Sequence, residues 1–271
     1  MARACHHRGE EPPLSGSHGA GTIFFAGCNL HCVFCQNHQI SHDVEGAATT
    51  DARGLADQML WLQDQGVHNI ALVTPSHVVP QILAALDLAA GGGLRLPLVY
   101  NTAAYERVAV LRELRGVVDV YLPDLKFGHD GRARGLFGGV VTDYVARSQG
   151  AVREMARQVG ALCVDGEGVA WRGLIVRHLV LPEDLAATGS VLRFVAEELG
   201  PETAVSLMAQ YRPPPELSLP PGLARALRPG EYQGAVDQLE KYGLHTGWVQ
   251  ALEATDTFVP DFDAPAHPFE R

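Results

Sequence analysis

The feature of this 271-residue chain that most restricts its fold is a regular alternation of two kinds of segment. Short apolar runs, typical of buried strands, alternate with longer segments whose apolar residues recur every three or four positions, as in amphipathic helices. Repeated β-α units of this kind form parallel sheets covered by helices. The expected strands are TIFFAG (22–27), NIALVTP (69–75), LPLVYNT (96–102), VVDVYLPDLKF (117–127), LIVRHLVLP (174–182) and AVSLMAQY (204–211).

The segments between these strands carry helix signals. Asp51 is a candidate N-cap for a helix over 51–66, and a triplet of glycines at 91–93 ends the next helix. Further helices are expected around 108–114, 142–159 and 184–199, and a last helix carries Tyr232 and Leu239 on one face. One interruption, around Asp165-Gly166, is typical of a small inserted hairpin.

The number of expected strands determines which barrel architecture we predict. A closed parallel barrel needs eight strands, and the sequence provides six. We therefore expect an open, partial (β/α)6 barrel of the TIM type, an α/β fold. Residues 1–21 are expected to form an N-terminal extension, and residues 22–271 the barrel domain with its C-terminal helix. Cys5, His6 and His7 in the extension are expected to be disordered or incidental.

Composition and charge exclude several classes of protein. No apolar run approaches the roughly 20 residues that span a bilayer, so we expect no membrane partner. A net charge of −10 without a basic cluster disfavours nucleic-acid binding. The first residues have no apolar signal-peptide core, which favours the cytoplasm, where thiols stay reduced. Five cysteines, an odd number, then favour metal binding or catalysis over disulfides.

Three of the five cysteines lie within eight residues of AGCNLHCVFCQN, directly after the first expected strand. The spacing is Cys28-x3-Cys32-x2-Cys35. A structural zinc site usually has four ligands in two pairs, and no second cysteine pair exists, although His31, His38 or His42 could complete a Cys3His site. Iron-sulfur clusters are also held by thiolates, and three thiolates leave one iron of a four-iron cluster open.

Polar residues also gather at the carboxyl ends of the expected strands, where ligands bind in parallel α/β folds. They are Thr74, Ser76, His77, Asn101, Thr102, Asp124, Lys126 and Gln210. Asp124, Lys126 and Ser76 also have a purely structural interpretation. Asp124 and Lys126 face the same side of a strand and could form an ion pair, and Ser76 could cap a helix. His178 is interpreted as a hydrogen-bonded core histidine, and Cys163 as a small buried residue.

The Cx3Cx2C motif, with Phe34 before its last cysteine, resembles the signature of the radical S-adenosylmethionine (SAM) superfamily. The segments GTIFFAGCNLHCVFCQN, TPSHVVPQIL, YNTAAYE and DVYLPDLKF, in this order, are similar to enzymes related to the pyruvate formate-lyase activating enzyme, especially its uncharacterised homologues. The resemblance covers residues from about Glu10 to Trp248.

The resemblance implies a role for each matching residue. Cys28, Cys32 and Cys35 would bind three irons of a [4Fe-4S] cluster, whose open iron binds SAM. Phe34 would lie near the adenine, and Thr74 and His77 stand where the family usually has Gly-Gly-Glu. The remaining residues with implied cofactor roles are Asn101, Thr102 and Asp124, at the place of a monovalent cation, Lys126 and Arg177, which reach toward the cofactor, and Gln210, at the place of a ribose-contacting histidine.

The activity that the resemblance implies is reductive cleavage of SAM to a 5'-deoxyadenosyl radical, which takes hydrogen from a protein, peptide or small-molecule substrate. It also implies a one-electron donor such as flavodoxin or ferredoxin, and activation of a glycyl-radical enzyme is one version of the reaction. The alternative class is a non-catalytic iron-sulfur or zinc-binding protein. Reconstitution with iron and sulfide, followed by an assay for 5'-deoxyadenosine, distinguishes the two classes.

Overall fold

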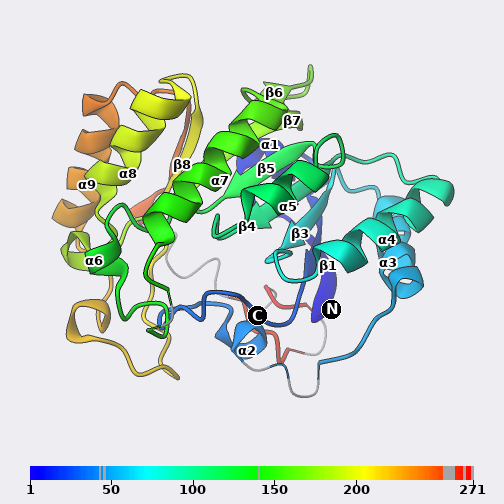
Figure 1. The fold of residues 1–271 in the computed structure, drawn as a ribbon, viewed down its shortest axis with the longest axis horizontal. Coiled ribbons are helices and arrows are strands. Elements are labelled where there is room, and N and C mark those ends of the chain that lie inside the picture. The colour runs from blue at the N-terminus through cyan, green and yellow to red at the C-terminus, as the bar shows by residue number, and fades with distance from the viewer. Residues whose placement is uncertain (43, 45–46, 140, 253–259, 265–266, 270–271) are drawn as a thin grey trace.

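The segments with apolar runs form one mostly parallel β-sheet, which helices surround in an α/β fold (Figure 1). The structure is a computed structural model that describes residues 1–42, 44, 47–139, 141–252, 260–264 and 267–269. Its strands are β1 Arg3–His7, β2 Ala20–Phe24, β3 Ile70–Val73, β4 Leu98–Thr102, β5 Val120–Pro123, β6 Cys163–Val164, β7 Ala170–Leu179, β8 Ala204–Met208 and β9 Gly247–Val249.

The order of the strands makes the sheet an open barrel. Along the sheet it is β1-β2-β3-β4-β5-β7-β8-β9, and every neighbouring pair from β2 onward is parallel. Strand β1 is antiparallel to β2 at one edge, and β6 forms a hairpin with β7. The two edge strands, β1 and β9, are not paired with each other in the described part of the chain. The expected open α/β barrel is therefore confirmed.

All six expected strands are present, and two further strands, β1 and β9, join the ends of the barrel. The expectation that Cys5, His6 and His7 are disordered or incidental is wrong. They lie in β1, where Cys5 faces Thr22 across the ladder, and Cys5 and His7 are buried. The apolar pattern missed β1 because its residues, RACHH, include one arginine and two histidines.

The six expected helices lie close to their expected positions, and three four-residue helices, the first, second and sixth, were not expected. The helices are α1 Pro12–Ser15, α2 His38–Ser41, α3 Ala52–Asp64, α4 Val79–Gly91, α5 Val108–Glu113, α6 Asp130–Ala133, α7 Tyr144–Val159, α8 Thr188–Phe194 and α9 Pro229–Lys241, with short 3-10 or π turns at η1 Pro182–Asp184, η2 Val195–Leu199 and η3 Pro221–Leu223. No helix among the described residues is long and apolar enough to cross a membrane.

Helix α3 shows why these segments fold as they do. The Asp51 side chain accepts a hydrogen bond of 2.8 Å from the Gly54 backbone N–H and so caps the first turn. Leu55, Met59 and Leu62 are spaced at three or four residues and are all buried against the sheet. Burial of each such side chain stabilises the fold by about 1.5–3 kcal/mol.

The hairpin expected at Asp165-Gly166 is also present. The Asp165 backbone N–H donates to the carbonyl of Val169, and the Asp165 carboxylate accepts from the N–H groups of Glu167 and Val169. Cys163, which was expected to be buried, is only partly buried in this hairpin, because the two-residue strand β6 lies outside the main path of the sheet.

The N-terminal segment closes the barrel interior at the amino-terminal ends of the parallel strands. Leu14 of α1 packs with Ala20, Ala71, Val99 and other inward-facing residues of the parallel strands. Small and branched side chains fill this narrow space, and polar side chains line the opposite end, where the parallel strands end. The fold therefore leaves one end of the barrel for a binding site.

Candidate functional site

The three clustered cysteines follow β2 in a loop at the carboxyl ends of the strands. Gly27, with φ of +86°, turns the chain, and its N–H donates to the carbonyl of Ile40 in α2. Cys28, Cys32 and Cys35 line one cavity of about 210 Å³, and all five cysteines of the chain are free thiols. The loop thus presents three thiols to one enclosed space.

Burial controls the protonation of two of these thiols. It raises the pKa of Cys32, which Lys126 opposes, and it raises the pKa of Cys35, which the Ser41 hydroxyl opposes at 3.2 Å. Cys32 and Cys35 are therefore protonated when they hold no metal. Any metal centre that binds here must displace these protons, so its affinity rises with pH.

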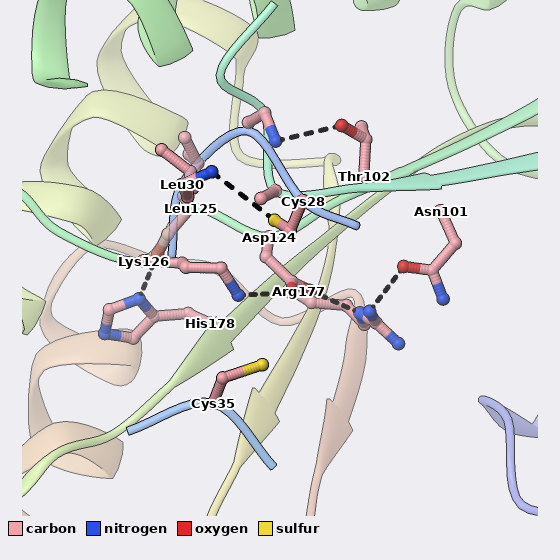
Figure 2. Close-up of polar contacts among 12 residues, drawn as sticks. Cys28, Leu30, Cys35, Asn101, Thr102, Asp124, Leu125, Lys126, Arg177 and His178 are labelled. Carbon is pink, nitrogen blue, oxygen red and sulfur yellow. Dashed lines mark hydrogen bonds and ion pairs between the residues drawn. The ribbon is translucent and has the colours of Figure 1, made fainter. Parts of the chain in front are cut away.

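A buried network of charges lies beside the cysteines (Figure 2). One Asp124 oxygen accepts from Arg177 Nε at 2.6 Å, and the other accepts from Lys126 Nζ at 2.7 Å. Arg177 Nη2 donates to Asn101 Oδ1 at 2.7 Å. Burial alone would raise the pKa of Asp124, but the two cations outweigh burial and hold this pKa below its usual value. The predicted ion pair between Asp124 and Lys126 is confirmed.

Tyr144 of α7 fixes the backbone that carries this network. Its hydroxyl accepts from the Lys126 N–H at 2.9 Å and lies within 3.0 Å of the carbonyl oxygens of Ala103 and Asp124. Tyr144 is fully buried against Phe127 and Phe137. The ends of β4 and β5 are thus held at one side chain, which keeps Asp124 and Lys126 in place.

Two acidic residues that the sequence patterns did not single out complete the network. Glu10 lines the cavity with a side chain that is 8% exposed, and its Oε2 lies 3.5 Å from Arg177 Nη1. Glu11 is also 8% exposed, and its Oε2 has no hydrogen-bond partner among the described residues. Burial raises the pKa of both, that of Glu11 to about 7, although Arg177 opposes the shift. No sequence signal links these residues to Arg177, which is more than 160 positions away.

Phe34, Thr74 and Gln210 also line the cavity. Phe34 packs edge-on against Phe127 and Tyr211, so its ring is held in a fixed orientation. Thr74 has a φ of +57°, and its N–H donates to the carbonyl of Asn101.

Gln210 is oriented by two other glutamines. Its Oε1 accepts from Gln250 Nε2 at 2.8 Å, and its backbone carbonyl accepts from Gln36 Nε2 at 2.9 Å. Within the part of the chain that the structure describes, no hydrogen bond from the side-chain amide nitrogen of Gln210 is present beside these two.

Two histidines have structural surroundings. His77 lies outside the cavity lining, and its Nε2 is 2.8 Å from the carbonyl oxygen of Ala26, so it supports the start of the cysteine loop. The ring nitrogens of His178 lie 2.6 Å from the Leu125 carbonyl oxygen and 2.9 Å from Thr188 Oγ1, which confirms the interpretation as a core histidine. Burial lowers the pKa of His178 to about 4, so the ring is neutral.

Ser76 and Thr102 bind a buried carboxylate that lies outside the cavity lining. Both hydroxyls donate to Oε1 of Glu106, the bond from Thr102 measuring 2.6 Å, and the Tyr100 hydroxyl donates to the same oxygen at 3.3 Å. Ser76 does not cap a helix with its side chain, since α4 begins without a side-chain cap. Glu106 therefore joins the ends of β3 and β4 beneath the cavity.

The donor set distinguishes between possible metal centres. Within the described residues, no three His, Cys, Asp or Glu side chains gather closely enough to hold a single metal ion, which disfavours the zinc alternative. A cubane cluster offers each thiolate its own iron, and three cavity-lining thiols beside two cations fit its sulfur-rich, anionic character. The oxygens of Asp124 and Asn101 accept hydrogen bonds from Arg177 and Lys126, so two side-chain cations lie where the resemblance implies a monovalent cation.

No protein-family model matches the chain. The uncharacterised protein MJ0674 of Methanocaldococcus jannaschii is 31% identical over 245 residues, a match that covers 88% of this chain and 66% of that protein.

Two solved structures share the fold at low sequence identity. A radical SAM methyltransferase from Sphaerobacter thermophilus has a TM-score of 0.58 and 14% identity, over 92% of this chain and 69% of that one. The radical SAM methyltransferase TsrM from Kitasatospora setae, with tryptophan and a SAM analogue bound, has a TM-score of 0.54 and 15% identity, over 94% of this chain and 58% of that one. The chain therefore has the fold of the radical SAM enzymes.

Proposed function

We propose that this protein is a radical SAM enzyme. The single observation that carries the proposal is the convergence of Cys28, Cys32 and Cys35 on a cavity that also holds Asp124 with its two cationic partners. When bound and reduced, a [4Fe-4S] cluster on these thiolates supplies one electron to the sulfonium of SAM, which splits into methionine and a 5'-deoxyadenosyl radical that takes hydrogen from the substrate.

The residues of this chain bind and orient the two groups. Lys126 and Arg177 place positive charge beside the thiolates and toward the carboxylate of SAM, while Asp124 holds both cations in position. Phe34 supplies an apolar face for the adenine, and Gln210 offers amide donors to the ribose. Thr74 lines the same wall. His77 acts through the loop that it supports, because its ring bonds to the backbone of Ala26.

We further propose that the enzyme resembles glycyl-radical activases in taking hydrogen from a protein or peptide, with a flavodoxin or ferredoxin as the electron donor. Two features support this version. The segments around the cysteines and the strand ends are similar to that group, and the open barrel leaves the side between β1 and β9 without a strand among the described residues. In the network of Asp124, Asn101 and Arg177, a guanidinium contacts the oxygens that the resemblance assigns to a monovalent cation.

Anaerobic reconstitution tests the proposal. The chain, treated with iron and sulfide and then with dithionite and SAM, should develop a brown chromophore and release 5'-deoxyadenosine. Cys32→Ala should lose both, whereas Cys163→Ala, which alters a partly buried cysteine in the β6-β7 hairpin, should keep both. Full 5'-deoxyadenosine release by Cys32→Ala would contradict the ligand assignment, and tightly bound zinc without a chromophore would favour the non-catalytic class.

A further inference from the structure

The C-terminal end of the chain covers one side of the cavity. We call the described residues 260–264 and 267–269 the C-terminal strap. In Figure 1 it is the red segment beside α2 and the N-terminal strand. Pro260 and Phe269 of the strap line the same cavity as the three cysteines, although they are more than 220 residues away in sequence.

The strap is seated by two aromatic side chains. Phe262 packs edge-on against Phe24 of β2, with ring centroids 5.0 Å apart, and Phe269 stacks on His7 of β1 at 4.0 Å. Both rings contact an apolar seat formed by Cys5, Phe24 and Val73. Aromatic anchors of this kind usually provide most of the binding energy of a peptide in a groove.

Hydrogen bonds to the strap involve its backbone as well as its side chains. Gln39 of α2 is the main contact: its Oε1 accepts from the Phe262 N–H at 2.9 Å, and its Nε2 donates to Asp263 at 2.9 Å and to Asp261 at 3.2 Å. Arg3 donates to the carbonyl of Ala264. These are contacts that any extended peptide with similar side chains could make.

The strap narrows the cavity that the proposed reaction would use. The cavity beside it measures about 210 Å³. Pockets for small-molecule ligands typically measure about 300–1,000 Å³. Because Pro260 and Phe269 of the strap form part of the lining, displacement of the strap would widen the cavity for a cluster, SAM and the reacting part of a substrate.

We propose that the seat beneath the strap is a docking groove for an extended peptide segment of the substrate, which displaces the strap and takes its place. The strap indicates the chemistry of that segment: aromatic side chains for the apolar seat, with acidic neighbours that reach Gln39. This inference rests on the proposed function, because it names the substrate class of the same site. It also places the substrate beside α2, which directly follows the cysteine loop.

Cys5 provides a direct probe of the strap. It is 5% exposed beneath the two phenylalanines, whereas Cys163 is partly exposed in the hairpin and serves as an internal standard. The ratio of their labelling rates with N-ethylmaleimide, measured by mass spectrometry on apoprotein and reconstituted protein, reports how often the strap leaves its seat. This ratio does not depend on SAM cleavage, so failure of the groove and failure of the radical chemistry are distinguished by assaying 5'-deoxyadenosine in the same samples.

Gln39→Ala should raise the labelling ratio at least five-fold, and Gln233→Ala, which changes an exposed glutamine on α9, should leave it unchanged. Adding a synthetic peptide with the sequence of residues 260–269 should restore protection of Cys5, and the same peptide with both phenylalanines replaced by serine should not. A ratio that rises but is not lowered by the peptide would overturn the docking groove. An unchanged ratio in both Gln39→Ala and Phe262→Ser would show that the strap is a fixed wall and would also overturn the proposal.

Discussion

Asp124→Asn is the substitution for which the structure gives the clearest energetic expectation. The Asp124 carboxylate is 17% exposed, and it neutralises two buried cations, Arg177 at 2.6 Å and Lys126 at 2.7 Å. An asparagine keeps the shape but removes the charge, so both cations remain buried without their shared anion. Breaking a buried ion pair by removing one partner costs about 3–5 kcal/mol of stability.

A matched control separates this effect from the loss of any carboxylate. Asp143 bonds to Arg147 at 2.9 Å, but both side chains are more than 40% exposed. Exposed pairs contribute about 0–1 kcal/mol, so Asp143→Asn should cost no more than this. Urea unfolding of the apoprotein, followed by circular dichroism at pH 7, gives both free energies of unfolding. Equal losses in the two variants would refute the reasoning.

The pH dependence gives a second check on Asp124. Burial would raise its pKa, but Arg177 and Lys126 together hold the pKa in the folded protein below the value of about 3.9 in the unfolded chain. The contribution of the carboxylate is therefore fully present above about pH 4 and is lost as the pH falls through the lower folded pKa. The difference between the native protein and Asp124→Asn should accordingly persist at pH 5, and its disappearance at that pH would contradict the assignment.

Three further predictions follow from other parts of the structure. Burial raises the pKa of Glu11 to about 7, so the stability that its neutral form provides is complete below about pH 4.5 and falls as the pH rises through 7. The loss is about 3 kcal/mol, at about 1.36 kcal/mol per pKa unit. Glu11→Gln should remove this loss when urea titrations at pH 5 and pH 8 are compared. Gly247→Ala should lower the free energy of unfolding by at least about 2 kcal/mol, because its φ is +128° and the new Cβ would lie 2.0 Å from the Val205 carbonyl oxygen. Gly230→Ala, which has open space around the new Cβ, should be tolerated when both variants are compared by thermal melting. Replacing potassium by tetramethylammonium should leave 5'-deoxyadenosine release unchanged, because Arg177 and Lys126 already supply positive charge to Asp124 and Asn101. A strong dependence on potassium would contradict this.

The local patterns of the sequence were sufficient for the framework of the fold. A strand or an amphipathic helix repeats its apolar residues within a few positions, so the six strands, the Asp51 cap and the hairpin at Asp165 could all be predicted. The cysteine spacing likewise lies within one loop. Polar residues at the ends of parallel strands must meet at one edge, which explains why Asn101, Asp124 and Lys126 were predicted near one another.

The remaining parts of the site depend on contacts between residues that are far apart in the chain, which no local period can report. Glu10 meets Arg177 only because the N-terminal segment enters the barrel, and Phe269 reaches the cavity only because the strap lies against β1 and β2. His77 has the residue type and position of a ligand, but the direction of its ring toward Ala26 is set by packing. The sequence by itself determined the strands, the helices and the three thiols, whereas the tertiary structure decided which buried charges face one another and what covers them, because burial and pairing arise only when distant segments pack.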